Sequence, residues 1–150
     1  MPTIDFDGAI RTSGQPTAED LARLGINGWR CVVNFRIEGE QPGMTSTVTE
    51  EEAVRAAGVE YRGYPIEMKR MSVEVVDRFR RELPELPRPL WAHCQSGKRA
   101  AAMVLMDEAI RRRLSGAEAV RLGEEKGIEW DHPELRDFVA DYVNSRRTRR

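Results

Sequence analysis

A short apolar segment that leads through a polar turn into a helix-forming stretch constrains the fold of this chain most. Residues 90–93, Leu-Trp-Ala-His, form a continuous and mainly apolar run, as in a strand covered on both faces. Residues 99–113 contain Ala, Met, Leu, Ile and Arg without Gly or Pro, which favours a long helix. Since a buried strand joined to a helix by a tight turn is the unit of α/β proteins, the junction predicts an α/β fold.

The remaining elements follow the same alternation. Residues 30–35, 59–64 and 89–93 are rich in β-branched and aromatic residues and predict strands, and residues 4–10 predict an edge strand. A capping residue followed three positions later by a carboxyl residue predicts the start of a helix. Such pairs are Thr17 with Asp20, Thr49 with Glu52, Ser115 with Glu118 and Asp131 with Glu134, and Ser72 predicts a further start. Strands and helices therefore alternate before a C-terminal cluster of helices.

Length and charge limit the classes of protein that this chain can belong to. The 150 residues suffice for one domain, 1–150, with its own core. Lys plus Arg number 24 against 25 Asp plus Glu, so no global field attracts nucleic acid or a membrane surface. The chain has no run of about 18 apolar residues and no secretory leader, and its two cysteines lack zinc-site spacing. We expect a soluble, cytoplasmic protein with no metal or cofactor, whose oligomeric state stays open.

The turn itself, residues 93–99, carries the chemistry. Its sequence is His-Cys-Gln-Ser-Gly-Lys-Arg, so Cys94 lies at the base of a turn of backbone amides that leads into a helix N-terminus. Such amides form a positive nest that binds small anions, and the same field favours the deprotonated sulfur. Cys94 is therefore predicted to be a reactive nucleophile in an anion-binding loop.

The other turn residues have predicted supporting roles. Gly97 provides a position that can take positive φ or approach a ligand closely. Arg99 has a planar fork that binds two oxygens of an anion at once, and Lys98 adds charge at the rim. Gln95 and Ser96 complete the predicted substrate-binding loop.

Three further residues are interpreted as structural rather than catalytic. His93 is interpreted as a strand-end residue whose ring bonds backbone and orients the loop, not as a general base. Cys31 lies mid-strand without such neighbours and is interpreted as a core residue. His132 is predicted to be a surface residue at a helix start.

Residues 91–99 resemble the signature loop of the cysteine-dependent protein phosphatases, especially the atypical dual-specificity branch. Residues 13–17, 32–36, 50–53 and 64–67 resemble the bacterial beta-lactamase-hydrolase-like phosphatase-like domain, over about residues 12–112. The resemblance implies a dual-specificity-phosphatase-like fold, with a central sheet of four to five mostly parallel strands flanked by helices. It implies that Cys94 attacks phosphorus to give a phosphocysteine while Arg99 and the loop amides hold the oxygens. The substrate would be a phosphoprotein or a small phosphomonoester.

This chain departs from the phosphatase pattern in three places. Four residues separate Cys94 from Arg99, where the phosphatase loop has five, and a shorter loop is the arrangement of rhodanese-type sulfurtransferases. Ala100 occupies the position where phosphatases have Ser or Thr. The general acid expected after the preceding strand falls near Met68, and the neighbouring Glu67 is our candidate.

These departures keep other possibilities open. Glu38 and Glu40, on the irregular stretch after Arg36, are alternative acids, and Arg36 itself is expected to have a structural, ion-pairing part. A sulfurtransferase would use a Cys94 persulfide and a sulfane-sulfur donor and would need no general acid. A non-catalytic oxyanion-binding module is the third alternative. Residues 39–49 are predicted to form an irregular loop beside the site.

Overall fold

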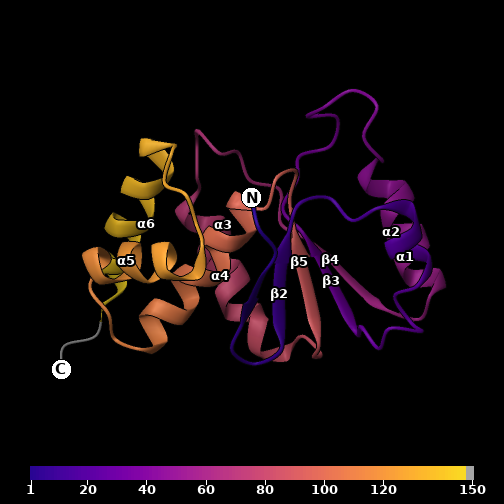
Figure 1. The fold of residues 1–150 in the computed structure, drawn as a ribbon, viewed down its shortest axis with the longest axis horizontal. Coiled ribbons are helices and arrows are strands. Elements are labelled where there is room, and N and C mark those ends of the chain that lie inside the picture. The colour runs from indigo at the N-terminus through magenta and orange to yellow at the C-terminus, as the bar shows by residue number, and fades with distance from the viewer. Residues whose placement is uncertain (148–150) are drawn as a thin grey trace.

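Five strands form one sheet in the computed structural model, which describes residues 1–147. The last three residues of the predicted 1–150 domain lie outside the described range. The spatial order is β1-β2-β5-β3-β4, with β1 antiparallel to β2 and all other neighbours parallel (Figure 1). The strands are β1 Ile4–Phe6, β2 Ile10–Ser13, β3 Cys31–Asn34, β4 Glu60–Gly63 and β5 Leu90–His93. The predicted mostly parallel α/β sheet of four to five strands is confirmed.

The N-terminal segment differs from its prediction as a single edge strand. Residues 4–13 form a hairpin, because Gly8 and Ala9 take φ of +79° and +60° and reverse the chain after Phe6. The second strand of this hairpin, β2, pairs in parallel with β5, so that Ser13 lies opposite His93. The end of β2 is thereby brought beside the Cys94 turn.

Helices cover both faces of the sheet, as the two apolar strands require. In Figure 1, α1 and α2 lie on one side and α3 to α6 on the other. The pleat sends alternate residues to the two faces, so Cys31, Val33 and Phe35 join the larger core while Val32 and Trp91 join the smaller one. The helices are α1 Ala18–Ala22, α2 Thr47–Ala56, α3 Val73–Glu82, α4 Lys98–Arg111, α5 Gly116–Lys126 and α6 Pro133–Arg146, with a short 3-10 turn at Leu83–Glu85.

Most of the predicted helix starts are confirmed. Thr17 and Ser115 form complete capping boxes, and the Ser72 hydroxyl accepts the Val75 amide. The prediction for Thr49 is wrong, because Ser46 caps α2 and its hydroxyl accepts the Thr49 amide three residues inside the helix. The helix therefore begins within the stretch 39–49 that was predicted to be irregular.

The prediction for Asp131 is also wrong. His132 occupies the N-cap of α6 without a side-chain capping bond, and Pro133 follows at the first helical position. The Asp131 carboxylate instead accepts a hydrogen bond from the Lys98 ammonium group. An ion pair between distant segments has displaced the local cap.

Helix α4 is the central helix of the larger core. It begins at Lys98 directly after the turn and packs against β2 and β5 on one side and against α5 and α6 on the other. Every residue from Arg99 to Ile110 is buried, so the helix N-terminus is rigidly placed behind the turn. Within residues 1–147, no helix has both the length and the apolar character needed to cross a membrane.

Candidate active site

The Cys94 turn is held in place by backbone contacts with the end of β2. Cys94 directly follows β5, its amide donates to the Ser13 carbonyl at 3.3 Å, and the Gln15 amide donates to the Gln95 carbonyl at 3.1 Å. The Gly97 amide donates to the Cys94 sulfur at 3.1 Å. Cys94 has no exposed surface, so its sulfur lies at the base of the turn.

Gly97 has the role that the sequence predicted for it. It takes φ of +102°, which only glycine adopts readily, and it is the N-cap of α4. A Cβ built on Gly97 would lie 3.2 Å from backbone atoms of Ser13 and Gly14. The left-handed conformation and the close approach both exclude a larger residue.

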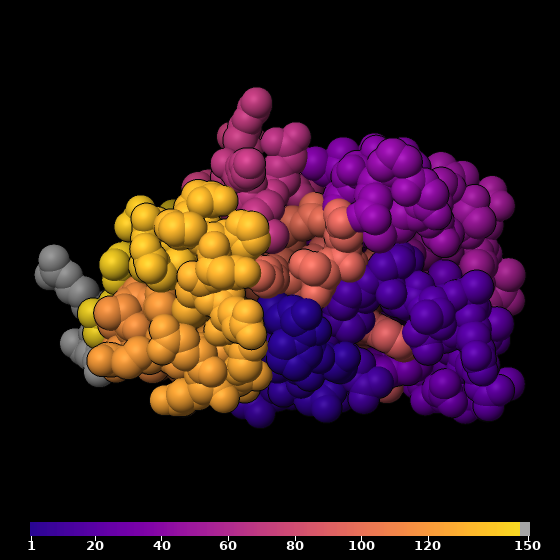
Figure 2. Space-filling view, turned by 45° about the horizontal axis from the view of Figure 1, so that its top comes forward, coloured from indigo at the N-terminus to yellow at the C-terminus, as the bar shows by residue number. Residues whose placement is uncertain are grey.

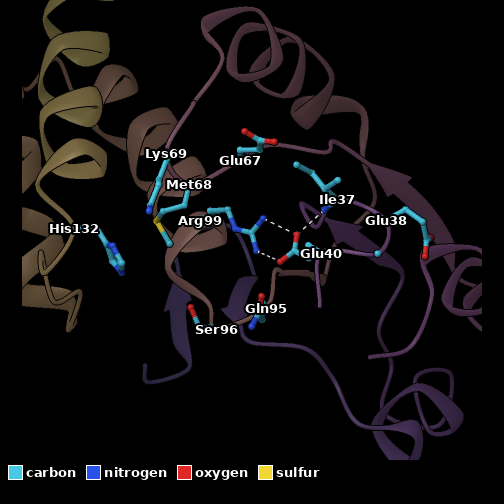
Figure 3. A pocket seen from close by; sticks show the side chains of 11 residues that line it. Ile37, Glu38, Glu40, Glu67, Met68, Lys69, Gln95, Ser96, Arg99 and His132 are labelled. Atoms are coloured by element: carbon cyan, nitrogen blue, oxygen red, sulfur yellow. Dashed lines mark hydrogen bonds and ion pairs between the residues drawn. The ribbon is translucent and has the colours of Figure 1, made fainter. Parts of the chain in front are cut away.

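Arg99 is anchored by a carboxylate that the sequence analysis considered only as a general acid. Its Nη1 donates to Glu40 Oε1 at 2.9 Å and to the Ile66 carbonyl at 2.9 Å, and its Nη2 donates to Glu40 Oε2 at 2.5 Å (Figure 3). Glu40 thus grips the end of the guanidinium. These three bonds use Nη1 twice and Nη2 once, so the Nε–Nη2 edge is the one that remains for Cys94 and for an anion.

The charge state of this pair follows from its contacts. Burial alone would lower the pKa of Arg99, but the hydrogen bonds and charges of Glu40 and Cys94 outweigh it and raise the pKa above its ordinary value. Burial alone would likewise raise the pKa of Glu40, but the bonds from Arg99 and from the Ile37 amide lower it below its ordinary value. Arg99 and Glu40 are therefore both charged at neutral pH.

His93 makes a buried pair that the sequence analysis did not foresee. Its Nε2 lies 2.6 Å from Oε2 of Glu50 on α2, and neither side chain is exposed. Burial would raise the pKa of Glu50, but His93, Gln15 and Arg36 together lower it. Nδ1 of His93 lies 3.4 Å from the Cys94 carbonyl oxygen, which agrees with the predicted role of orienting the loop.

The same network continues away from the turn. The Gln15 side-chain amide donates to Glu50 Oε1 at 2.6 Å, and Nη1 of Arg36 donates to Gln15 Oε1 at 2.6 Å. Arg36 is only 2% exposed, yet within residues 1–147 no carboxylate lies within ion-pair distance of it. The prediction that Arg36 forms a direct ion pair is therefore wrong. Its charge still contributes at longer range to the lowered pKa of Glu50.

A cavity of about 690 Å³ opens in front of Arg99. Figure 2 shows the segment near residue 95 reaching the surface where segments near residues 40, 68 and 132 meet. The cavity is lined by residues 37–40 after β3, residues 67–69 after β4, Gln95, Ser96 and Arg99 of the turn, and His132 at the start of α6 (Figure 3). Segments from four parts of the chain thus meet at the carboxyl end of the sheet.

The predicted binding residues divide between two surroundings. Gln95 and Ser96, which were predicted to bind substrate, are exposed and line the cavity. Lys98 does not line it, because its ammonium group is paired with Asp131. The cation missed by the sequence analysis is Lys69, which is exposed at the cavity and forms no ion pair or hydrogen bond with the described residues.

The candidate acids differ in their contacts. Glu67 lines the cavity, its side chain is 54% exposed, and it lies 3.9 Å from Arg70. Hydrogen bonds from the Thr47 hydroxyl and amide lower the pKa of Glu38, and Glu40 is held by Arg99 as a carboxylate. Proton donation is therefore unfavourable at Glu38 and Glu40.

The second cysteine lies too far from the site to form a disulfide with Cys94. In the register of β3 and β5, Cys31 is opposite Leu90, and Cys94 follows four residues later. Four residues of strand span about 13 Å, whereas the Cα atoms of a disulfide lie within roughly 7 Å. Burial raises the pKa of Cys31 to about 12, which agrees with its interpretation as a core residue.

Comparison with known proteins places this chain in a family. The family described as "Beta-lactamase hydrolase-like protein, phosphatase-like domain" matches residues 6–110. The chain belongs to this family. A beta-lactamase hydrolase-like protein of Agrobacterium fabrum is 26% identical over 129 residues, and one of Xylella fastidiosa is 27% identical over 129 residues. Each match covers 86% of this chain, which spans about 30% of the length of these curated relatives.

Solved structures share the fold at low identity. Tk-PTP in its active form is 22% identical with a TM-score of 0.73, and the alignment covers 97% of this chain and 98% of that one. The core catalytic domain of the PP-IP phosphatase SIW14 from S. cerevisiae is 13% identical with a TM-score of 0.69, covering 90% and 81%. The dual-specificity-phosphatase-like fold implied by the resemblance is confirmed.

Proposed function

We propose that this chain is a cysteine-dependent phosphatase. The observation that carries the proposal is the placement of the Cys94 sulfur. It accepts the Gly97 amide at 3.1 Å and interacts electrostatically with Arg99, on the fold of a phosphatase-like family. These donors face the sulfur and can hold the oxygens of a phosphate that the sulfur attacks.

The proposed reaction has two steps. The Cys94 sulfur attacks phosphorus, the bond from phosphorus to the ester oxygen breaks, and Glu67 gives its proton to the leaving alcohol. Water then gives a proton to the Glu67 carboxylate and attacks the phosphocysteine, the S–P bond breaks, and phosphate leaves as the thiolate re-forms. Arg99 holds two phosphate oxygens through its Nε–Nη2 edge in both steps, because Glu40 fixes the other end of the guanidinium.

The substrate class follows from the cavity. Lys69 is a cation free to meet a second acidic group, whereas Glu38 and Glu67 disfavour densely charged polyanions. The cavity of about 690 Å³ accommodates a small molecule or one modified side chain. We infer that a phosphomonoester or a phosphoprotein side chain is the substrate.

A rhodanese-type sulfurtransferase is the second candidate, and the short turn favours it. Only four residues separate Cys94 from Arg99, and Ala100 is fully buried in α4, so that position provides no hydroxyl to assist departure of the thiolate. Cys94 would attack the outer sulfur of thiosulfate, the S–S bond would break, and sulfite would leave. The resulting persulfide would pass its outer sulfur to cyanide and give thiocyanate, without any proton donor.

One assay separates the candidates. Wild type and Cys94→Ser are compared on an aryl phosphate and on thiosulfate with cyanide, without added metal. The proposal expects phosphate release that disappears in Cys94→Ser, because a serine hydroxyl there stays protonated and weakly nucleophilic. Cys94-dependent thiocyanate without phosphate release would replace it by the sulfurtransferase. Binding of tungstate by both proteins with no turnover would leave the non-catalytic oxyanion-binding module.

A further inference from the structure

A second cavity, of about 340 Å³, lies beside the first at the carboxyl ends of β3 and β4. Glu38 lines both cavities, so they adjoin. The second cavity is lined by three arginines from three different elements: Arg36 after β3, Arg55 on α2 and Arg62 on β4. The proposed phosphatase reaction uses none of them.

Arg36 is unusual among these arginines because it is buried with few partners. Its side chain donates to Gln15 through Nη1, its Nε is buried without a hydrogen-bond partner, and no carboxylate of residues 1–147 is in ion-pair contact with it. A buried guanidinium normally has an ion partner, and a buried donor normally has an acceptor. Glu38, Glu40 and Glu50 experience its charge only at longer range.

The other charges of the cavity are already in use. Arg55 is paired with Glu51 at 2.8 Å, and the Glu38 carboxylate accepts the Thr47 amide at 2.8 Å. Arg62 is paired at 2.9 Å with Glu60, which does not line the cavity. Arg55 and Arg62 thus each have a carboxylate in contact. Among the arginines of this cavity, Arg36 is the one whose charge has no contact partner within residues 1–147.

We propose that this second cavity binds a small oxyanion group, a carboxylate or a phosphate, on the Arg36 guanidinium. The buried Nε–H and the remaining Nη protons can donate to two oxygens of such a group, with Arg55 and Arg62 adding positive charge around it. The group is either a free anion or a second acidic group of a molecule that also occupies the main cavity. Binding here does not require Cys94 chemistry, so the proposal stands apart from the proposed function.

The test uses the ¹⁵N-labelled Cys94→Ser variant of residues 1–150, which lacks the proposed nucleophile. Inorganic phosphate and malonate are titrated at low salt while NMR follows the arginine Nε–H signals and two sets of backbone amides. The Gly63 amide reports on the second cavity, and the amides of residues 95–97 report on the main cavity. The proposal expects the Arg36 Nε–H and Gly63 signals to shift and saturate. If the malonate titrations at Gly63 and at residues 95–97 have equal midpoints, the second cavity binds the second acidic group of a molecule that also occupies the main cavity. If the midpoints differ, the second cavity binds a separate anion.

Two further variants control for folding. Arg62→Gln changes a half-buried residue at the cavity, and we expect it to weaken binding at the second cavity by about fivefold through loss of one charge-assisted contact. Arg81→Gln, at an exposed position of α3, is the matched control and should leave binding unchanged. Arg36→Gln should abolish the Gly63 shift while the amide spectrum stays dispersed.

The proposal is overturned by either of two results. In the first, signals of residues 95–97 titrate while the Arg36 Nε–H and Gly63 signals stay still at the same anion concentrations. In the second, Arg62→Gln binds as tightly at the second cavity as Arg81→Gln. Neither result depends on whether the protein has phosphatase activity.

Discussion

Replacement of Glu50 by alanine tests whether the buried pair with His93 holds the active-site turn in place. The Glu50 carboxylate is unexposed and accepts hydrogen bonds from Nε2 of His93 and from the side-chain amide of Gln15, each at 2.6 Å. Alanine removes the acceptor from both donors. The His93 donor then remains fully buried and the Gln15 donor partly buried.

The expected cost follows from these two contacts. Glu50→Ala leaves the buried His93 donor and the partly buried Gln15 donor without their acceptor, and each such loss costs about 1–3 kcal/mol. We therefore expect Glu50→Ala to lower the free energy of unfolding by about 4 kcal/mol, out of the roughly 5–15 kcal/mol of an ordinary domain. At about 2–4 °C per kcal/mol for this chain length, Tm should fall by about 8–16 °C.

The assay is urea unfolding of wild type, Glu50→Ala and a matched control. Glu52→Ala is the control, because Glu52 lies exposed on the same helix, and we expect it to stay within about 0.5 kcal/mol of wild type. Glu50→Gln keeps one acceptor oxygen and should recover part of the loss. If Glu50→Ala unfolds at the same urea concentration as Glu52→Ala, the pair with His93 contributes nothing and the reasoning is refuted.

Four further predictions follow from the contacts of the site. Because folding lowers the pKa of Glu50, its carboxylate contributes its full stabilisation above the unfolded pKa of about 4.3 and loses it as the pH falls through the folded pKa. The difference in unfolding free energy between wild type and Glu50→Gln should therefore shrink from pH 7 to pH 3, and an unchanged difference would contradict this. Arg99→Lys should lower kcat on an aryl phosphate by about 10²–10³-fold, since a lysine ammonium group cannot bind the Glu40 carboxylate and two phosphate oxygens at the same time. A near-normal rate would mean that the loop amides alone stabilise the transition state. Glu40→Gln should lower kcat/KM by roughly tenfold or more, because Arg99 loses the partner that orients it, and unchanged kinetics would remove that role. Iodoacetamide at pH 8 should leave Cys31 of the native protein unlabelled, because burial raises its pKa to about 12. Mass spectrometry that finds label on Cys31 in the native state would contradict its assignment as a core residue.

Most of the sheet could be predicted from the sequence because its signals are local. Three of the predicted strands and the start of α4 lie within a residue of the observed elements, since apolar runs and breakers act over a few residues. The hairpin of residues 4–13 was missed although Asp7-Gly8 is a turn signal. The starts at Thr49 and Asp131 failed because contacts elsewhere in the chain, or a better cap nearby, outweighed a plausible local pattern.

The candidate site also contains residues that local sequence signals identify and residues that they do not. Cys94, Gly97 and Arg99 could be identified because one turn contains them, and the amides of that turn act on the thiol wherever the rest of the chain lies. Glu40 and Glu50 could not be assigned their roles. They are 59 and 43 residues away from the groups that they bind, and neither has a local pattern that marks it for burial.

The sequence by itself determined the α/β class and the turn that holds the candidate nucleophile, because periodicity and turn chemistry act between near neighbours. Only the tertiary structure decided which carboxylates are held as anions and which stay available to a substrate. It paired Lys98 with Asp131, placed Lys69 at the cavity and buried Arg36 with no ion partner among residues 1–147. Charge and burial depend on groups that folding brings together from distant segments, and no local pattern in a single sequence records that proximity.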